Sequence, residues 1–277
     1  MIASSHRQNA FKGHREKMEK TNDVTVILPT LNESGNIRTL IEQIRKSVPE
    51  CSVIVVDDCS KDGTAEIVKS MISDGIQNLS VIERAGVPCL TDSIQLGIDS
   101  ATTQIVCWMD ADLSHPPAIL PALIDRARIS GCGVASRFID GSKAKQTSGS
   151  PDSFAATVLS TILNILVKKW LQIKMTDFTS GFIACKREYL MNHRLVGDYG
   201  EYFIELMHYF THSGIEIREV AFESPARTWG ESKTGTSLWK LAKRGIKYLK
   251  LAFVLRFRSP RSAVPHSTSQ RSKLFAN

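Results

Sequence analysis

Two pairs of carboxylates follow apolar runs of the chain. Asp57 and Asp58 come directly after SVIVV, and Asp110 and Asp112, with one alanine between them, come directly after QIVCWM. Hard carboxylate oxygens with open coordination positions suit a divalent cation that bridges a diphosphate. For an isolated Asp-x-Asp, a turn with a capping aspartate is the favoured interpretation, and only its position beside Asp57 and Asp58 at the strand ends favours a metal site.

Three cations have the chemistry to bind phosphate. Arg137 ends an expected strand, and Arg227 and Lys233 flank a Gly-Glu-Ser turn. A guanidinium can hold two phosphate oxygens in a fixed fork, so such residues could position an anionic acceptor against a sugar donor. By composition alone, solvated loop charges are the favoured interpretation of Arg227 and Lys233.

Two glutamates, Glu201 and Glu205, lie one turn apart on an expected helix. A phosphate acceptor is already ionised near neutral pH, whereas a hydroxyl acceptor needs a general base, for which either glutamate is a candidate. Solvated helix acids are the alternative. His115, next to the aspartate pair, is interpreted as a structural residue, because oxygen ligands suit the expected ion better.

The elements that must position these residues alternate between strand and helix. VTVIL and SVIVV are apolar at nearly every position, as central parallel strands are, and the residues between them are apolar at helical spacing. The same alternation continues through LSVI to QIVCWM, which predicts a doubly wound α/β sheet. Ligands bind such sheets beyond the carboxyl ends of the strands, so the carboxylates should converge on one rim.

Charge is distributed unevenly along the 277 residues, whose formal net charge is +7. Between residues 23 and 237, 26 acidic residues outnumber 20 basic ones, and this acidic body argues against a nucleic-acid-binding protein. No run reaches the 18 or so apolar residues of a membrane span. The six cysteines lack metal-ligand spacing and suggest reduced thiols in a cytoplasmic protein.

A basic amphipathic helix is expected from Leu238 to Phe257. Its cations are Lys240, Lys243, Arg244, Lys247 and Lys250, and its apolar residues include Leu238, Trp239, Leu241, Leu249, Ala252, Phe253 and Leu255. Such a helix can lie in the headgroup layer of a membrane as a peripheral anchor. Packing on the domain with a solvated basic face is an equal alternative.

Six motifs, in order and spacing, resemble the dolichol-phosphate mannosyltransferase branch of the family 2 glycosyltransferases. They are VILPTLNESGNI, VVDDCSKDGT, MDADLSHPP, ASR, DFTSGF and RTWGESK, and together they extend from Val24 to about Lys250. Six motifs in register are far more specific than a single Asp-x-Asp. The resemblance implies a GT-A fold, which is one α/β domain that uses a nucleotide sugar and Mg²⁺ or Mn²⁺ and inverts the anomeric carbon.

The resemblance also assigns residues. It places Pro29, Glu33 and Asp58, with the neighbouring Asp57, at the nucleoside, and Asp110, Asp112 and Ser114 at the metal, Ser114 standing where the family often has Gln. It places Asp177, Ser180, Gly181 and Ser232 on the acceptor side, and Asp112, Arg137, Arg227, Lys233 and Glu205 in catalysis. Trp229, within RTWGESK, suits either sugar stacking or the core.

One segment departs from the family. Between Arg137 and Asp177 the family usually carries a basic segment with Trp or Arg, but here Lys143 and Lys145 are the basic residues before a helix expected from Phe154 to Val167. This departure bears on the acceptor more than on the donor. A bacterial-type polyprenyl phosphate or another lipid-linked acceptor therefore stays open beside dolichyl phosphate.

The sequence thus predicts an N-terminal arm (1–22), a GT-A domain (23–237), the basic helix (238–257) and a disordered tail (258–277). The expected activity is transfer of mannose from GDP-mannose to a polyprenyl or dolichyl phosphate at a cytosolic membrane face. One alternative is transfer from a UDP-sugar to a lipid or saccharide hydroxyl. A non-catalytic nucleotide-sugar-binding subunit is another, against which the intact Asp110, Asp112, Arg137 and Arg227 weigh.

Overall fold

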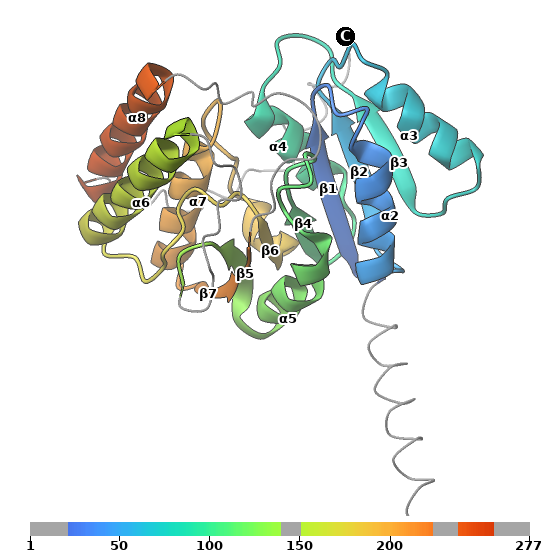
Figure 1. Ribbon diagram of the computed structural model, residues 1–277. Coiled ribbons are helices and arrows are strands. Elements are labelled where there is room, and N and C mark those ends of the chain that lie inside the picture. The colour runs from blue at the N-terminus through green and yellow to red at the C-terminus, as the bar shows by residue number, and fades with distance from the viewer. Residues whose placement is uncertain (1–21, 140–150, 224–237, 258–277) are drawn as a thin grey trace, which may run out of the picture.

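One mixed sheet organises the molecule. The computed structural model describes residues 22–139, 151–223 and 238–257, and for 151–159 and 238–244 it gives the helical backbone alone. Within these ranges seven strands pair in the order β3-β2-β1-β4-β6-β5-β7 (Figure 1). They are β1 (Val24–Thr30), β2 (Ser52–Asp57), β3 (Leu79–Glu83), β4 (Ile105–Trp108), β5 (Gly131–Ser136), β6 (Ile183–Lys186) and β7 (Glu216–Ala221).

Helices cover both faces of this sheet. They are α2 (Ile37–Ser47), α3 (Thr64–Ser73), α4 (Leu90–Ser100), α5 (Leu120–Ser130), α6 (Pro151–Leu171), α7 (Glu201–His212) and α8 (Leu238–Phe257), with short 3₁₀ helices η1 (Pro117–Ile119) and η2 (Arg187–Leu190). One apolar core joins α2, α3 and α5 to the sheet, and the other joins α4, α6, α7 and α8 to it.

The first four strands are parallel, and β1, β2 and β4 are buried on both faces, whereas β3 lies at the edge of the sheet and is partly exposed. Val26 of β1 pairs with Val53 of β2 and with Cys107 of β4, and these three side chains are buried in the core beside α2. The neighbouring Ile27 is buried in the opposite core. Continuous apolar runs are what such doubly covered strands require, so the sequence's α/β prediction is confirmed.

The sixth strand runs against its neighbours. β6 pairs antiparallel with both β4 and β5, whereas β5 pairs parallel with β7. The amino end of β6 therefore meets the carboxyl ends of β4 and β5. This arrangement brings the loop before β6, which contains Ser180 and Gly181, to the same rim as the turn after β4.

The C-terminal helix α8 packs on α6 and α7 (Figure 1). Tyr248, Ala252 and Leu255 of α8 are buried in the core that α6 and α7 share. The structure therefore corrects the expectation that Ala252 and Leu255 belong to a membrane-facing side. Among the described helices, none combines the length and the hydropathy that crossing a bilayer requires.

Candidate active site

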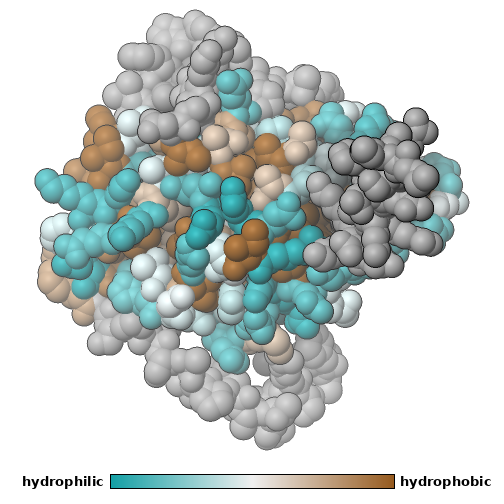
Figure 2. All heavy atoms as spheres, turned by 90° about the horizontal axis from the view of Figure 1, so that it is seen from below, coloured by the Kyte–Doolittle hydropathy of each residue, from teal (hydrophilic) through white to brown (hydrophobic). Residues whose placement is uncertain are grey.

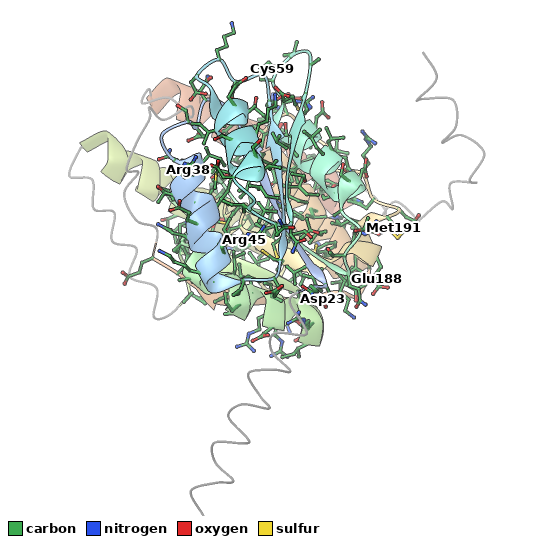
Figure 3. The ribbon with its side chains drawn as sticks, turned by 90° about the vertical axis from the view of Figure 1, so that its right-hand side faces the viewer. Asp23, Arg38, Arg45, Cys59, Glu188 and Met191 are labelled. Atoms are coloured by element: carbon green, nitrogen blue, oxygen red, sulfur yellow. The ribbon has the colours of Figure 1, made fainter. Side chains whose placement is uncertain are left out.

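Two loops meet at the carboxyl ends of β1 and β2. Asp57, at the end of β2, accepts hydrogen bonds on Oδ1 from the hydroxyls of Thr30 (3.0 Å) and Ser60 (2.6 Å), and on Oδ2 from the Ser60 N–H (3.0 Å). Asn32 donates its N–H to Ser60 Oγ at 2.8 Å. Cys59, in the second loop, lies at the top of Figure 3, at the end of the sheet opposite Asp23. Asp57 thus holds the two loops together, and its contact with a substrate stays a prediction.

Glu33 and Pro29 lie at the same end of the sheet. The Glu33 carboxylate is buried and accepts a hydrogen bond from the Asn36 side chain at 2.9 Å. The backbone N–H of Glu33 donates to Thr64 Oγ1 at 2.9 Å. Pro29 is half-buried near the end of β1 and pairs with Val56. These contacts fix the position of Glu33 before any ligand is present.

Asp58 has a partner that the sequence analysis missed. Its Oδ1 forms an ion pair with Arg84, and its Oδ2 accepts the Cys89 N–H at 2.6 Å. The Arg84 side chain is largely buried and also contacts Asp92 at 3.2 Å. Arg84 directly follows the run LSVIE, so its place after a strand was the available signal. The pair neutralises one carboxylate of the rim.

A tight turn from Asp110 to Ser114, called here the acidic turn, follows β4. Asp112 is buried and its Oδ1 accepts the Ser114 N–H at 3.0 Å, while Asp110 is exposed. Leu113 has φ 64°, a left-handed conformation that tightens the turn. The structure therefore shows the capped turn and leaves Asp110 exposed at the rim, and the metal role of Asp110 and Asp112 stays a prediction.

The buried His115 holds the acidic turn in place by a hydrogen bond and by packing on two phenylalanine rings. Its ring stacks on Phe182 at 4.9 Å between centroids and contacts the edge of Phe222 at 5.8 Å. Nδ1 accepts the Asp110 N–H at 3.0 Å, so this nitrogen carries no proton. Burial lowers the pKa of His115, although Asp110 and Asp112 act in the opposite direction. The structural interpretation of His115 fits this geometry.

Arg137, after β5, forms a fork with the buried Asp177. Arg137 Nε donates to Oδ2 at 2.8 Å and Nη2 to Oδ1 at 2.9 Å, and Nη2 also donates to Thr179 Oγ1 at 2.9 Å. Burial alone would raise the pKa of Asp177, but attraction and hydrogen bonds from Arg137 hold it below its usual range. The Arg137 guanidinium, which the sequence analysis assigned to phosphate, thus donates two hydrogen bonds to the Asp177 carboxylate. About a third of the side chain, 32%, remains exposed at the rim.

Electrostatic effects show which of these residues are neighbours. Burial lowers the pKa of His115, Asp110, Asp112 and Asp177 act to raise it and Arg137 to lower it, so all four charged groups are near enough to this buried ring to act on it. Tyr202, at the start of α7, was missed by the sequence analysis. Its Oη accepts the Trp108 Nε1–H at 3.0 Å, and its pKa is raised by burial, with Asp110 acting in the same direction. The residues named here come from the ends of four elements, which are β4, β5, β6 and α7.

The two glutamates of α7 contact different partners. Glu205 is 2.9 Å from His193 Nε2, and the His193 ring stacks on Tyr209 at 3.9 Å. Glu201 is buried, forms an ion pair with Lys247 of α8 and accepts the Asp198 N–H at 3.2 Å. Both carboxylates thus have structural partners, and a general-base role for either stays a prediction.

The acceptor-side residues are only partly described. Ser180 is buried and its Oγ accepts the Phe182 N–H at 3.3 Å, and Gly181 has φ +67°, which glycine adopts readily. The segment 224–237 lies outside the described residues, and with it Arg227, Trp229, Ser232 and Lys233. Lys143 and Lys145 lie outside them as well.

The donor set of the acidic turn fits a hard cation that is shared with a diphosphate. Asp110 and Asp112 supply carboxylate oxygens, with the Ser114 hydroxyl beside them. In the part of the chain that the structure describes, no three His, Cys, Asp or Glu side chains are grouped so as to hold an ion by themselves. Mg²⁺ or Mn²⁺ held by these residues would complete its coordination with phosphate oxygens and water.

Three curated relatives match most of this chain. Polyprenol monophosphomannose synthase of Mycolicibacterium smegmatis is 27% identical over 82% of this chain and 88% of its own length. Dolichol-phosphate mannosyltransferase of Pyrococcus furiosus is 30% identical over 76% of this chain and 58% of its own length. The protein of that name from Saccharomyces cerevisiae is 28% identical over 85% of this chain and 88% of its own length.

Solved structures share the fold. Glucosyl-3-phosphoglycerate synthase from Mycobacterium tuberculosis, in complex with Mn²⁺, uridine diphosphate and phosphoglyceric acid, matches with a TM-score of 0.65 and 19% identity. The match covers 89% of this chain and 83% of that one. At this identity the likeness shows the architecture, which is GT-A.

A family model adds the last comparison. The model described as Glycosyl transferase family 2 matches residues 25–194, which is more than half of the chain. That span includes the acidic turn, Arg137 and Asp177. The chain belongs to glycosyl transferase family 2, and it is a glycosyltransferase of the GT-A fold.

Proposed function

We propose that this glycosyltransferase moves mannose from GDP-mannose to the phosphate of a polyprenyl lipid. The observation that carries the proposal is the likeness, at 27–30% identity, to relatives named for polyprenol- or dolichol-phosphate mannosyl transfer. The site is compatible with it, because the turn after β4, Arg137 after β5 and the loop before β6, with Asp177 and Gly181, lie at one rim of the sheet.

On the donor side, Pro29, Glu33 and Asp58 line the nucleoside pocket in this proposal. Asp110 and Asp112 would hold Mg²⁺ or Mn²⁺, which stabilises the charge that develops on a departing nucleoside diphosphate. Ser114 keeps Asp112 in place through its N–H. The buried His115 holds the Asp110 backbone by accepting its N–H on Nδ1.

On the acceptor side, Arg137 is proposed to meet the lipid phosphate with the exposed part of its side chain. Arg227, Ser232 and Lys233 are proposed as further phosphate contacts. A phosphate acceptor needs no general base, and the pairing of Glu201 with Lys247 and of Glu205 with His193 favours this acceptor over a hydroxyl.

Because the proposed acceptor is a bilayer lipid, the reaction would take place at a membrane surface. We infer that the protein works as a peripheral protein at the cytosolic face of a membrane. The acceptor's phosphate would lie at that face, within reach of the rim that holds Arg137.

Nucleotide release across a donor panel tests the proposal. GDP-mannose, GDP-glucose, UDP-glucose and UDP-N-acetylglucosamine are each supplied with and without a polyprenyl phosphate, in Mn²⁺, Mg²⁺ or EDTA. GDP release that requires both polyprenyl phosphate and a divalent ion is expected. Release of UDP with a hydroxyl acceptor would replace the proposal with the alternative activity.

A further inference from the structure

Exposed apolar side chains are concentrated on α6 and α8. Nine of the fourteen large apolar residues that are exposed in the described part of the chain lie on these two helices. They are Ile162, Ile165, Leu166, Trp170, Ile246, Leu249, Phe253, Val254 and Phe257, called here the α6–α8 surface. The helices pack against each other at one side of the molecule (Figure 1), so the residues form one joint surface.

Three aromatic rings join the two helices on this surface. Trp170 stacks on Phe253 at 5.7 Å and meets the edge of Phe257 at 6.3 Å, and the two phenylalanines are 5.2 Å apart. Their exposed fractions are 42%, 56% and 73%. Single exposed apolar residues are ordinary, but a contiguous group with ring-to-ring contacts indicates a binding surface.

The charged residues around the surface are basic. Lys168 and Lys169 of α6 and Lys250 and Arg256 of α8 are exposed, and α8 contains no acidic residue. Lys247 does not belong to this group, because it forms ion pairs with Asp198 and Glu201. Brown and teal side chains lie next to one another at the left edge of Figure 2, on the side where Figure 1 places α6 and α8.

A basic hollow adjoins the surface at the end of α6. It has a volume of about 420 Å³ and is lined by Ile165, Lys168, Lys169, Gln172, Ile173 and Lys174. The wall of this open hollow is mostly apolar and three exposed lysines contribute to it, a combination that suits a phosphate attached to an apolar tail.

These observations favour a lipid bilayer over a protein partner. Protein interfaces are depleted in lysine, whereas lysine beside aromatic and aliphatic residues is typical of helices in the headgroup layer. The inner side of α8 is also fixed to the catalytic domain, because Tyr248 is buried against α7 and its hydroxyl lies against Gly200. A membrane bound to the outer side would therefore have a defined position relative to the rim.

We propose that α6 and α8 together form the membrane-binding surface of this protein. The rings of Trp170, Phe253 and Phe257 enter the apolar side of the headgroup layer, and the hollow of Lys168, Lys169 and Lys174 takes the phosphate of an anionic lipid. The proposal rests on the proposed function in one respect, namely that the acceptor is a membrane lipid. It differs from a single amphipathic helix in that both helices are required.

Vesicle flotation of the full chain tests the surface. Vesicles of phosphatidylcholine with phosphatidylglycerol should bind the protein more strongly than phosphatidylcholine alone, and high salt should weaken the binding. The double variant Trp170→Ser/Phe253→Ser should lose at least tenfold in vesicle affinity. Ile129→Ser, which changes an apolar residue of α5 that is 72% exposed, is the matched control and should bind as the wild type does.

The hollow is tested by charge. The double variant Lys168→Gln/Lys169→Gln should lose the preference for anionic vesicles. The control Arg38→Gln/Lys46→Gln removes two positive charges from α2 instead, and this variant should still prefer anionic vesicles. Circular dichroism and thermal unfolding confirm that each variant folds. Turnover of a short, water-soluble polyprenyl phosphate should be retained in all four variants, which separates failure of the surface from failure of the proposed function.

Three outcomes would overturn the proposal. They are no flotation of the wild type with anionic vesicles, equal flotation of the wild type and Trp170→Ser/Phe253→Ser, and a concentration-dependent dimer in sedimentation that the same variant abolishes. The last result would assign the surface to a second copy of the chain.

Discussion

At the scale of single residues, the site is built from charges that are already paired within the protein. Asp58 pairs with Arg84, and Arg137 pairs with Asp177. Paired charges keep a fixed geometry at low dielectric and need no ligand to remain charged. In the acidic turn, Asp110 is exposed at the rim and Asp112 is buried beside it.

Asp112→Asn tests the metal assignment. The variant keeps the shape of the side chain but loses the anionic oxygen, so metal-dependent nucleotide release should fall by at least about a hundredfold. Steady-state kinetics across a range of Mn²⁺ concentrations measures the effect. Asp125→Asn, an exposed change on α5, is the control and should leave turnover unchanged. Wild-type activity in Asp112→Asn would remove the metal role.

Arg137→Ala tests the ion pair through stability. Removing one partner of a buried pair costs about 3–5 kcal/mol, and the partial exposure of Arg137 reduces this to about 2 kcal/mol. Because the pKa of Asp177 is lower in the folded state, its contribution is complete above the unfolded value of about 3.9 and is lost as the pH falls through the folded value. Urea unfolding should therefore show a large difference at pH 7 that shrinks in strong acid.

The exposed pair of Arg218 and Glu216 is the control for this experiment. Its side chains are 47% and 57% exposed, so Arg218→Ala should change the free energy of unfolding by less than about 1 kcal/mol. A difference for Arg137→Ala that does not depend on pH would contradict the ionic explanation.

Glu201→Gln and Glu205→Gln test for a general base. A base contributes about 10²–10⁴-fold to rate, whereas both carboxylates have structural partners here. Acceptor-stimulated turnover should stay within a factor of a few of the wild type in both variants. A loss of the size expected for a base in either variant would revive the hydroxyl acceptor.

At the scale of elements, the antiparallel β6 and the close approach of β5 to α5 shape the rim. A Cβ on Gly133 of β5 would lie 2.4 Å from the backbone oxygen of Leu123 in α5, so this contact is possible only for glycine. This close contact fixes the distance between β5 and α5, and with it the position of Arg137, which follows β5.

Gly133→Ala should therefore destabilise the fold by about 1–3 kcal/mol, because a backbone atom must move to admit the methyl group. Gly245→Ala in α8 is the matched control, since nothing lies within 4 Å of its added Cβ. It should stabilise the protein by up to about 1 kcal/mol through helix propensity. Urea unfolding compares the two, and equal effects would contradict the close packing of β5.

At the scale of the whole molecule, the distribution of charge suits the two proposed partners, a nucleotide sugar and an anionic membrane surface. The acidic body contains the rim, where a cation and a diphosphate would offset the carboxylates. Exposed basic residues lie on α6 and α8, at the side proposed to meet lipid. One molecule can thus bind a nucleotide sugar and an anionic surface without either charge opposing the other.

Thermal unfolding with ligands tests the donor at this scale. A ligand at a hundred times its Kd stabilises the folded state by about 2.7 kcal/mol, which corresponds to about 5–10 °C in Tm for a domain of this size. GDP with Mn²⁺ should give this shift, whereas GDP or Mn²⁺ alone should give much less. A larger shift with UDP and Mn²⁺ would redirect the donor assignment to a UDP-sugar.

The sequence by itself determined the elements and the place of the carboxylates. Apolar periodicity is local, so VTVIL, SVIVV and QIVCWM predicted buried parallel strands, and the rule for ligands in α/β sheets placed Asp58 and Asp110 at one rim. The family motifs supplied most of the candidate site residues for the same reason, since each motif is a short contiguous stretch.

Only the tertiary structure decided which charges are paired and which surface is open. Arg84 meets Asp58, Asp177 meets Arg137 and Lys247 meets Glu201 across 26, 40 and 46 positions of the chain, and no local pattern encodes such contacts. The helical period also could not tell which side of α8 is buried. Packing on α6 and α7 decided it, because burying Tyr248, Ala252 and Leu255 left Phe253 and Phe257 exposed beside Trp170.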